Sequence, residues 1–163
     1  MRRALAVLIP LTALLASPLA ARDSLGMFAD WGAFRDPAVP RCYAIAKAAP
    51  SAMQRDYSPY ASVGTWPKRS IRGQIHFRLS RKLAADPRIQ LVISGRRFAM
   101  AGGGGDAWAP DRATDAAIVA AMRSAGSMTI SASDSRGRRF SNTYDLAGAA
   151  TALDAATIGC ARR

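Results

Sequence analysis

The middle of the chain reads Gln74-Ile75-His76-Phe77-Arg78-Leu79-Ser80, and this stretch decides the expected fold. Its apolar residues, Ile75, Phe77 and Leu79, alternate with polar residues. In an extended strand successive side chains point to opposite faces of the sheet. The alternation therefore predicts a β-strand with one buried face and one polar face.

Strand-like segments lie on both sides of residues 74–80. Two hairpins are expected C-terminal to it, one with its turn at Ser94-Gly95 and one with its turn around Arg136-Gly137. The polar residues 51–60 are expected to form a surface loop. The other expected strands are residues 27–34, 42–46, 89–93, 97–100, 128–132 and 140–144.

Two helices are expected in the C-terminal half. Asp111 or Thr114 can cap the first, because the side-chain oxygen of either can accept a hydrogen bond from an exposed amide of the first turn. Gly126 stands where a left-handed residue commonly follows a helix. The last helix is expected to start near Asp145, and its apolar residues have helical spacing: Leu146, Ala149, Ala150 and Leu153.

These elements predict one domain over residues 22–163, of the α+β class and mostly β. We expect an antiparallel, β-sandwich-like arrangement of strands with two helices in the C-terminal half. A domain of this length can bury a substantial core.

Residues 1–21 are set apart from this domain as a removable signal peptide. Arg2 and Arg3 precede an apolar run over residues 4–16, and small residues then offer cleavage after Ala20 or Ala21. The run is too short to cross a bilayer as a helix, which needs about 20 residues. We therefore expect a periplasmic or secreted protein with no transmembrane segment after cleavage.

The two cysteines, Cys42 and Cys160, lie near the two ends of the expected domain. In an oxidising compartment, two and only two thiols placed this way predict one disulfide. The bond would join the first strands to the C-terminal segment.

The chain carries a formal net charge of +12, or about +10 once Arg2 and Arg3 leave, and it contains no glutamate. Such a charge favours association with acidic surfaces. Between residues 68 and 97 a single acid, Asp86, accompanies a dense set of basic residues that includes Arg88. A second basic cluster, Arg136, Arg138 and Arg139, lies at a turn. The candidate anion-binding residues are Lys68, Arg69, Arg72, Arg78, Arg81, Lys82, Arg96 and Arg97.

Two interpretations of these cations stay open. They are either a solvated face of an arginine-rich chain or a contact surface for an anionic polymer or lipid headgroup, since arginine matches phosphate and carboxylate groups. Export and the lack of a nucleic-acid-binding motif argue against nucleic acid.

No catalytic, metal or cofactor site is indicated. His76 is the only histidine, and it is interpreted as a solvated strand residue. A zinc site would need more His and Cys ligands than remain. Residues 102–105 are all glycine but lack the Lys-Ser/Thr of a phosphate-binding loop, so a linker between strands is expected.

Three neighbouring carboxylates, Asp106, Asp111 and Asp115, are candidates for an acid/base pair or an oxygen-ligand cation site. Helix capping accounts for Asp111, and the positive end of the helix dipole accounts for Asp115. Asp106 is interpreted as a loop residue.

Several short motifs resemble the invasion-associated locus B (IalB) family across nearly the whole mature chain, with the C-terminal half the more specific. Ala149 stands where family members tend to have an aromatic residue after the glycine of the last helix. The motifs are Asp30-Trp31 ahead of Cys42, Ala107-Trp108, residues 118–123, Ser127-Met128, and residues 144–148 through Ala152-Leu153 to Cys160.

The resemblance implies an exported, β-rich protein of the periplasm or outer surface, without known catalytic residues or cofactor. The family takes its name from entry of a pathogen into host cells. We therefore expect a non-enzymatic binding module for a protein partner or an anionic glycan or lipid headgroup. The alternatives are an exported hydrolase that uses Asp carboxylates and a purely structural component of the periplasm.

Overall fold

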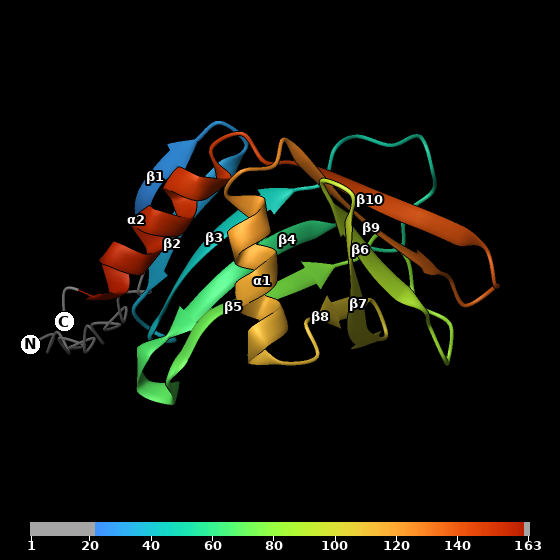
Figure 1. Cartoon of the computed structure of the whole chain (residues 1–163), viewed down its shortest axis with the longest axis horizontal. Helices are drawn as coiled ribbons and strands as arrows, with labels where there is room; N and C mark the ends of the chain where they lie inside the picture. The colour runs from blue at the N-terminus through green and yellow to red at the C-terminus, as the bar shows by residue number, and fades with distance from the viewer. Residues whose placement is uncertain (1–21, 162–163) are drawn as a thin grey trace, which may run out of the picture.

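The computed structural model describes residues 22–161, which form one antiparallel sheet of ten strands with two α-helices (Figure 1). The expected signal peptide, residues 1–21, lies outside the described residues. Across the sheet the strand order is β1-β2-β3-β4-β5-β8-β7-β6-β9-β10. The strands are β1 Asp23–Phe28, β2 Trp31–Asp36, β3 Arg41–Lys47, β4 Tyr60–Trp66, β5 Ile71–Arg78, β6 Ile89–Ile93, β7 Arg96–Gly103, β8 Asp106–Trp108, β9 Ser127–Ser133 and β10 Arg139–Asp145.

Strand β5 has the alternation that its sequence predicts. Ile75 and Phe77 are fully buried, whereas His76 and Arg78 lie half-buried on the opposite face. Strand β4 pairs with β5 along most of its length, but β8 pairs with it only at residues 76–78. The first part of β5 therefore has no strand on its β8 side.

The sheet curls so that its last strand returns to the ends of strands far away in the sheet order. Trp31 Nε1 donates to the carbonyl oxygen of Asp145 at 2.8 Å. The backbone N–H of Ser80 donates to the side-chain oxygen of the buried Asn142 at 3.0 Å. This curvature gives the sandwich-like arrangement, and the α+β, mostly β class expected from the sequence is confirmed.

Helix α1 (Arg112–Met122) packs on β5 and β6. The predicted cap is confirmed, because the Asp111 carboxylate accepts a hydrogen bond from the N–H of Thr114 at 2.7 Å. Ile118 and Met122 face the core. Among residues 22–161, neither this helix nor the next is long and apolar enough to cross a membrane.

Helix α2 (Ala149–Ala161) packs mainly on β1, β2 and β3, on the same side of the sheet as α1 (Figure 1). It begins four residues later than expected, because Asp145 ends β10 and a turn follows. Gly148 adopts a φ of +80°, and a Cβ at this position would collide with the backbone oxygen of Phe28. The close approach of this turn to β1 therefore requires glycine.

Three other expectations were wrong. The segment 27–34 is not one strand, because Ala29 takes a φ of +48° and turns the chain between β1 and β2. Strand β4 begins at Tyr60, the last residue of the expected loop 51–60, and was not predicted. Gly126 does not take a positive φ, and α1 ends without a left-handed residue.

The predicted disulfide is confirmed. Cys42 on β3 and Cys160 on α2 are bonded, with Cα atoms 5.7 Å apart across 118 positions of sequence. The bond fixes the C-terminal turns of α2 to the sheet.

Candidate functional site

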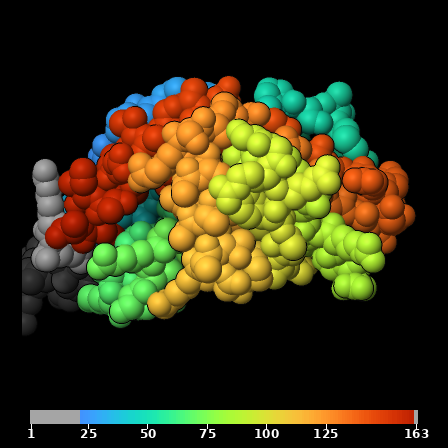
Figure 2. Space-filling model, viewed as in Figure 1, coloured from blue at the N-terminus to red at the C-terminus, as the bar shows by residue number. Residues whose placement is uncertain are grey.

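A groove lies between the two helices, because α1 and α2 stand on different strands. Its floor is formed by β4 and the first part of β5, with Val63 and Gly73 among the lining residues. Figure 2 shows it as a hollow between the orange atoms of α1, the red atoms of α2 and the green atoms of the β4–β5 hairpin. Its volume is about 590 Å³, within the roughly 300–1,000 Å³ of small-molecule sites.

Small side chains on the helices keep the groove open. Ala116 and Ala120 line it from α1, and Ala156 and Ala161 line it from α2. Larger apolar residues in these places would meet across the gap and close it. The signal in the sequence was therefore the alanine content of the two helices.

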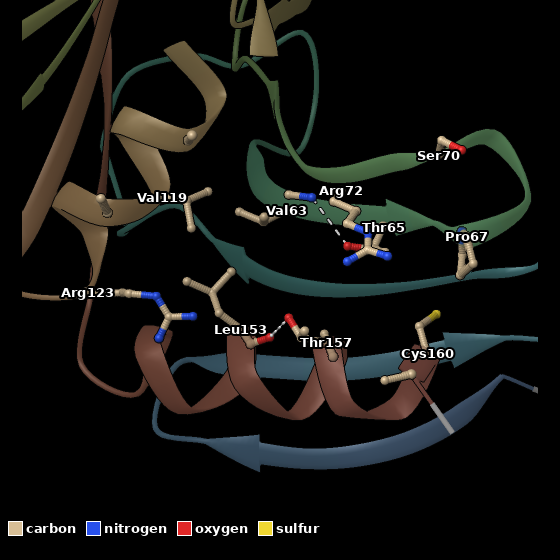
Figure 3. A pocket seen from close by; sticks show the side chains of 15 residues that line it. Val63, Thr65, Pro67, Ser70, Arg72, Val119, Arg123, Leu153, Thr157 and Cys160 are labelled. Carbon is tan, nitrogen blue, oxygen red and sulfur yellow. Dashed lines mark hydrogen bonds between the residues drawn. The ribbon is translucent and has the colours of Figure 1, made fainter. Parts of the chain in front are cut away.

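One end of the groove is closed by an ion pair between the helices. Arg123, which follows α1, places Nη2 2.7 Å from the Asp154 carboxylate of α2. The hydrogen bond to Asp154 raises the pKa of Arg123, and the same bond lowers the pKa of Asp154. Figure 3 shows Arg123 at this end of the groove, and Asp154 neutralises its charge within the protein.

The opposite end carries unpaired positive charge. The β4–β5 turn contains a short 3-10 helix, Pro67–Arg69, and its cations are Lys68 and Arg69, with Arg72 following on β5. All three side chains are exposed, and within residues 22–161 none of them forms an ion pair. Pro67, Ser70 and Arg72 line the groove itself. We call Lys68, Arg69 and Arg72 the cationic hairpin.

The disulfide borders the same end of the groove. Cys160 lines the groove beside Thr157 and Ala161, and its partner Cys42 is buried in β3 below. The bond therefore holds the part of α2 that faces the cationic hairpin. This links the strongest covalent constraint of the fold to the shape of the groove.

The remaining candidate cations lie elsewhere. Arg78 pairs with Asp106 and places its guanidinium 3.8 Å from the centre of the Tyr57 ring. Lys82 is exposed, away from the groove. Arg96 and Arg97 are exposed on the β6–β7 hairpin. The structure thus brings together only three of the eight predicted anion-binding residues.

Arg81 is buried beside Asp134, which the exposed Arg138 also contacts, and we call these three residues the Asp134 cluster. Nη2 of Arg81 lies 3.1 Å from the Asp134 carboxylate, and Nη2 of Arg138 lies 3.0 Å from it. The backbone N–H groups of Arg136 and Arg138 also donate to this carboxylate, each at 2.9 Å. Arg81 is only 8% exposed, so its charge serves an internal ion pair and is withdrawn from solvent.

The pKa of Asp134 reflects these partners. Burial alone would raise it, but the hydrogen bonds from the backbone and side chain of Arg138 and the backbone of Arg136 outweigh burial and lower it. The carboxylate is therefore held in its charged form, as the two arginines require.

His76 was interpreted as a solvated strand residue, but it is part of an aromatic and charged cluster. Its ring stacks on Trp108 with centroids 5.2 Å apart, and Tyr60 packs edge-on against it. Nε2 of His76 lies 3.0 Å from the carboxylate of Asp106. Asp106 is a residue of β8 bound to His76 and Arg78, so the interpretation of it as a loop residue was wrong.

The three candidate carboxylates have separate partners. Asp106 binds His76 and Arg78, Asp111 caps α1 at the surface, and Asp115 accepts a hydrogen bond from the buried N–H of Ile75 at 2.8 Å. Burial raises the pKa of Asp115. No group of three His, Cys or Asp side chains within residues 22–161 is arranged to hold a metal ion.

A scan of protein-family models, a search of curated proteins and a search of solved structures found no match to this chain. The function is therefore argued from the geometry of the groove and its charges.

Proposed function

We propose that this chain is an exported, non-catalytic binding protein of the bacterial envelope, of the invasion-associated locus B type. Its binding site is the groove between α1 and α2 together with the cationic hairpin, and its ligand is acidic. The single observation that carries the proposal is the unpaired positive charge of Lys68, Arg69 and Arg72 at the open end of a pre-formed groove.

Charge complementarity supports an acidic ligand. In the Asp134 cluster, a buried aspartate forms ion pairs with the arginines. At the mouth of the groove, no acid among the described residues forms an ion pair with Lys68, Arg69 or Arg72. Three neighbouring cations repel one another, and an anion from outside relieves that repulsion.

The separate partners of Asp106, Asp111 and Asp115 favour binding over hydrolysis. A carboxylate pair for acid/base catalysis would have two side chains on one reacting group. Here one carboxylate caps a helix, one binds a backbone N–H and one bridges two cationic or titratable side chains.

The test compares two triple variants of the mature, oxidised protein on heparin-agarose. Lys68, Arg69 and Arg72 are changed to Glu in one variant, and the exposed Arg88, Arg96 and Arg97 are changed to Glu in the other. The two variants have equal net charge, so we expect only the first to elute at clearly lower salt. Equal elution would show that net charge alone governs binding, and the proposed site would be abandoned.

Export has its own test. Fractionation of cells that express the full chain should recover the protein in the periplasm or medium, and N-terminal sequencing should find it starting at Ala21 or Arg22. Recovery of the uncleaved chain in the cytoplasm would contradict this part of the proposal.

A further inference from the structure

We propose that the acidic ligand is an amphiphile with one acyl chain and an anionic headgroup, whose chain lies in the groove and whose headgroup binds the cationic hairpin. This inference rests on the proposed function and specifies the chemical class of its ligand. The headgroup chemistry is an anionic oxygen group, either a carboxylate or a phosphate.

The apolar part of the groove fits a hydrocarbon chain. Val63, Val119 and Leu153 come from three different elements and gather toward the Arg123 end (Figure 3). Arg123 is neutralised there by Asp154, so this end offers no free charge. An apolar chain placed here leaves water for an apolar environment, which is favourable in proportion to the area buried.

The polar part lies at the other end and gives the ligand its direction. Arg72, Pro67 and Ser70 stand at the hairpin end of the groove in Figure 3. Lys68 and Arg69 are in the same turn. An anionic headgroup at this end would contact cations that have no internal partner, while its chain points toward Leu153.

Other ligand classes fit the lining less well. A sugar needs free hydrogen-bonding side chains, but Thr65 accepts from the N–H of Gly73 at 3.3 Å and Thr157 donates to the carbonyl of Leu153 at 2.8 Å. An extended peptide needs an open strand edge. The N–H of Ile75, on the part of β5 that β8 does not reach, is already bound by Asp115.

The experiment measures binding of soluble single-chain lipids below their micelle concentration to the mature, oxidised protein by titration calorimetry. The probes are palmitate and palmitoyl lysophosphatidate, which separate the carboxylate from the phosphate source. Palmitoyl lysophosphatidylcholine tests the need for net negative charge, and glycerol phosphate tests the need for the chain. We expect the anionic lipids to bind at least about tenfold more tightly than either control, a factor that corresponds to about 1.4 kcal/mol.

A variant that fills the groove tests the contribution of the acyl chain to binding separately from that of the hairpin's positive charge. Ala120 lines the groove and is exposed, so Ala120→Trp occupies the groove without disturbing the core. Ala113→Trp is the matched control, because Ala113 is exposed on the same helix but does not line the groove. We expect Ala120→Trp to lose lipid binding about tenfold or more, whereas Ala113→Trp keeps it.

Any one of four outcomes would overturn the inference. If no lipid binds, or if glycerol phosphate binds as well as the lipids, the ligand is not an amphiphile, and heparin retention decides separately whether the hairpin site stands. If Ala120→Trp still binds the lipids as tightly as the parent, the acyl chain does not lie in the groove. If the protein dimerises with increasing concentration and Ala120→Trp abolishes the dimer, a second copy of the chain occupies the groove.

Discussion

The Asp134 cluster and the cationic hairpin are both made of basic residues, but the structure uses them in opposite ways. In the first, Arg81 and Arg138 converge on one buried carboxylate that also receives two backbone N–H groups. In the second, Lys68, Arg69 and Arg72 are exposed beside a groove, with no acid among residues 22–161 paired to them. The comparison shows that an arginine is available to a ligand only where the fold supplies no aspartate.

Two of the buried aspartates, Asp134 and Asp115, also differ in their partners. Asp134 has cations around it and a lowered pKa, whereas Asp115, in the first turn of α1, has one backbone N–H as its partner and a pKa raised by burial. Asp115 therefore has a single hydrogen bond and no cation as its partner, whereas Asp134 has two arginines. We infer that Asp134 contributes to stability through an ion-pair network and Asp115 through one hydrogen bond.

The largest effect should come from removing the disulfide, which holds the groove half together. The double variant Cys42→Ala with Cys160→Ala is expected to lose about 2–5 kcal/mol of unfolding free energy, since an unfolded chain without the link is less constrained. Urea denaturation measures the loss. Hydrogen exchange should show α2 losing protection before β9 and β10, and uniform loss of protection would break the comparison.

The next effect concerns the Asp134 cluster itself. Arg81→Met keeps the apolar part of the side chain but leaves a buried carboxylate with one cation fewer, so we expect a loss of about 3 kcal/mol. Urea denaturation of Arg96→Met is the control, because Arg96 is exposed and its removal should change the free energy of unfolding by less than about 0.5 kcal/mol. Similar losses in the two variants would mean that Arg81 has no special structural role.

Asp115 offers a smaller effect with a distinctive pH dependence. Asp115→Ala leaves the N–H of Ile75 without an acceptor, and we expect a loss of about 1–3 kcal/mol. Asp115→Asn keeps an acceptor oxygen and should remain close to the parent in stability at neutral pH.

The sign of the pH dependence follows from the raised pKa of Asp115. The folded protein holds this proton more tightly than the unfolded chain, so the contribution of Asp115 to stability grows as pH falls from the folded pKa toward the ordinary value of 3.8. Denaturation curves across this range should therefore show the parent gaining stability relative to Asp115→Asn. Asp134, whose pKa is lowered, contributes in the opposite direction, and its stabilisation is lost as pH falls through its folded pKa.

The smallest effect on stability is expected where the effect on binding is largest. Changing Lys68, Arg69 and Arg72 together to Gln should alter the free energy of unfolding by less than about 0.5 kcal/mol, because none of them has a partner in the described structure. Thermal and urea denaturation both measure this. A large loss of unfolding free energy would mean that these cations stabilise the fold, as Arg81 does.

The sequence predicted those parts of the fold that depend on local pattern. The alternation at Ile75 and Phe77, the hairpins at Ser94-Gly95 and Arg136-Gly137, and the cap at Asp111 were all recoverable. Strand β4 was not, because its central residues, 61–65, are mostly small and lack a clear apolar alternation. The β1–β2 turn was missed because Ala29 occupies a left-handed position that glycine usually marks.

Most of the candidate site could not be predicted from the sequence. It depends on ion pairs between residues far apart in the sequence and on small side chains that leave space between the helices. The candidate set included Arg72 and Arg81 alike, and only the position of Asp134 separates them. The groove exists because the two helices pack on different strands and the small side chains of Ala120 and Ala156 do not fill the space between them. The sequence alone shows neither the position of Asp134 beside Arg81 nor the space between the helices.

The packing of α2 on β1, β2 and β3 has a consequence for the order of folding. These strands are the first part of the described chain to be synthesised, and the helix that covers them is the last. Ala33 and Ala44 are fully buried in the folded protein. They stay exposed to solvent until the C-terminal residues that form α2 have been synthesised. Contacts between such distant segments form slowly, so the earliest strands made should be among the latest to become native, and most in need of a chaperone meanwhile.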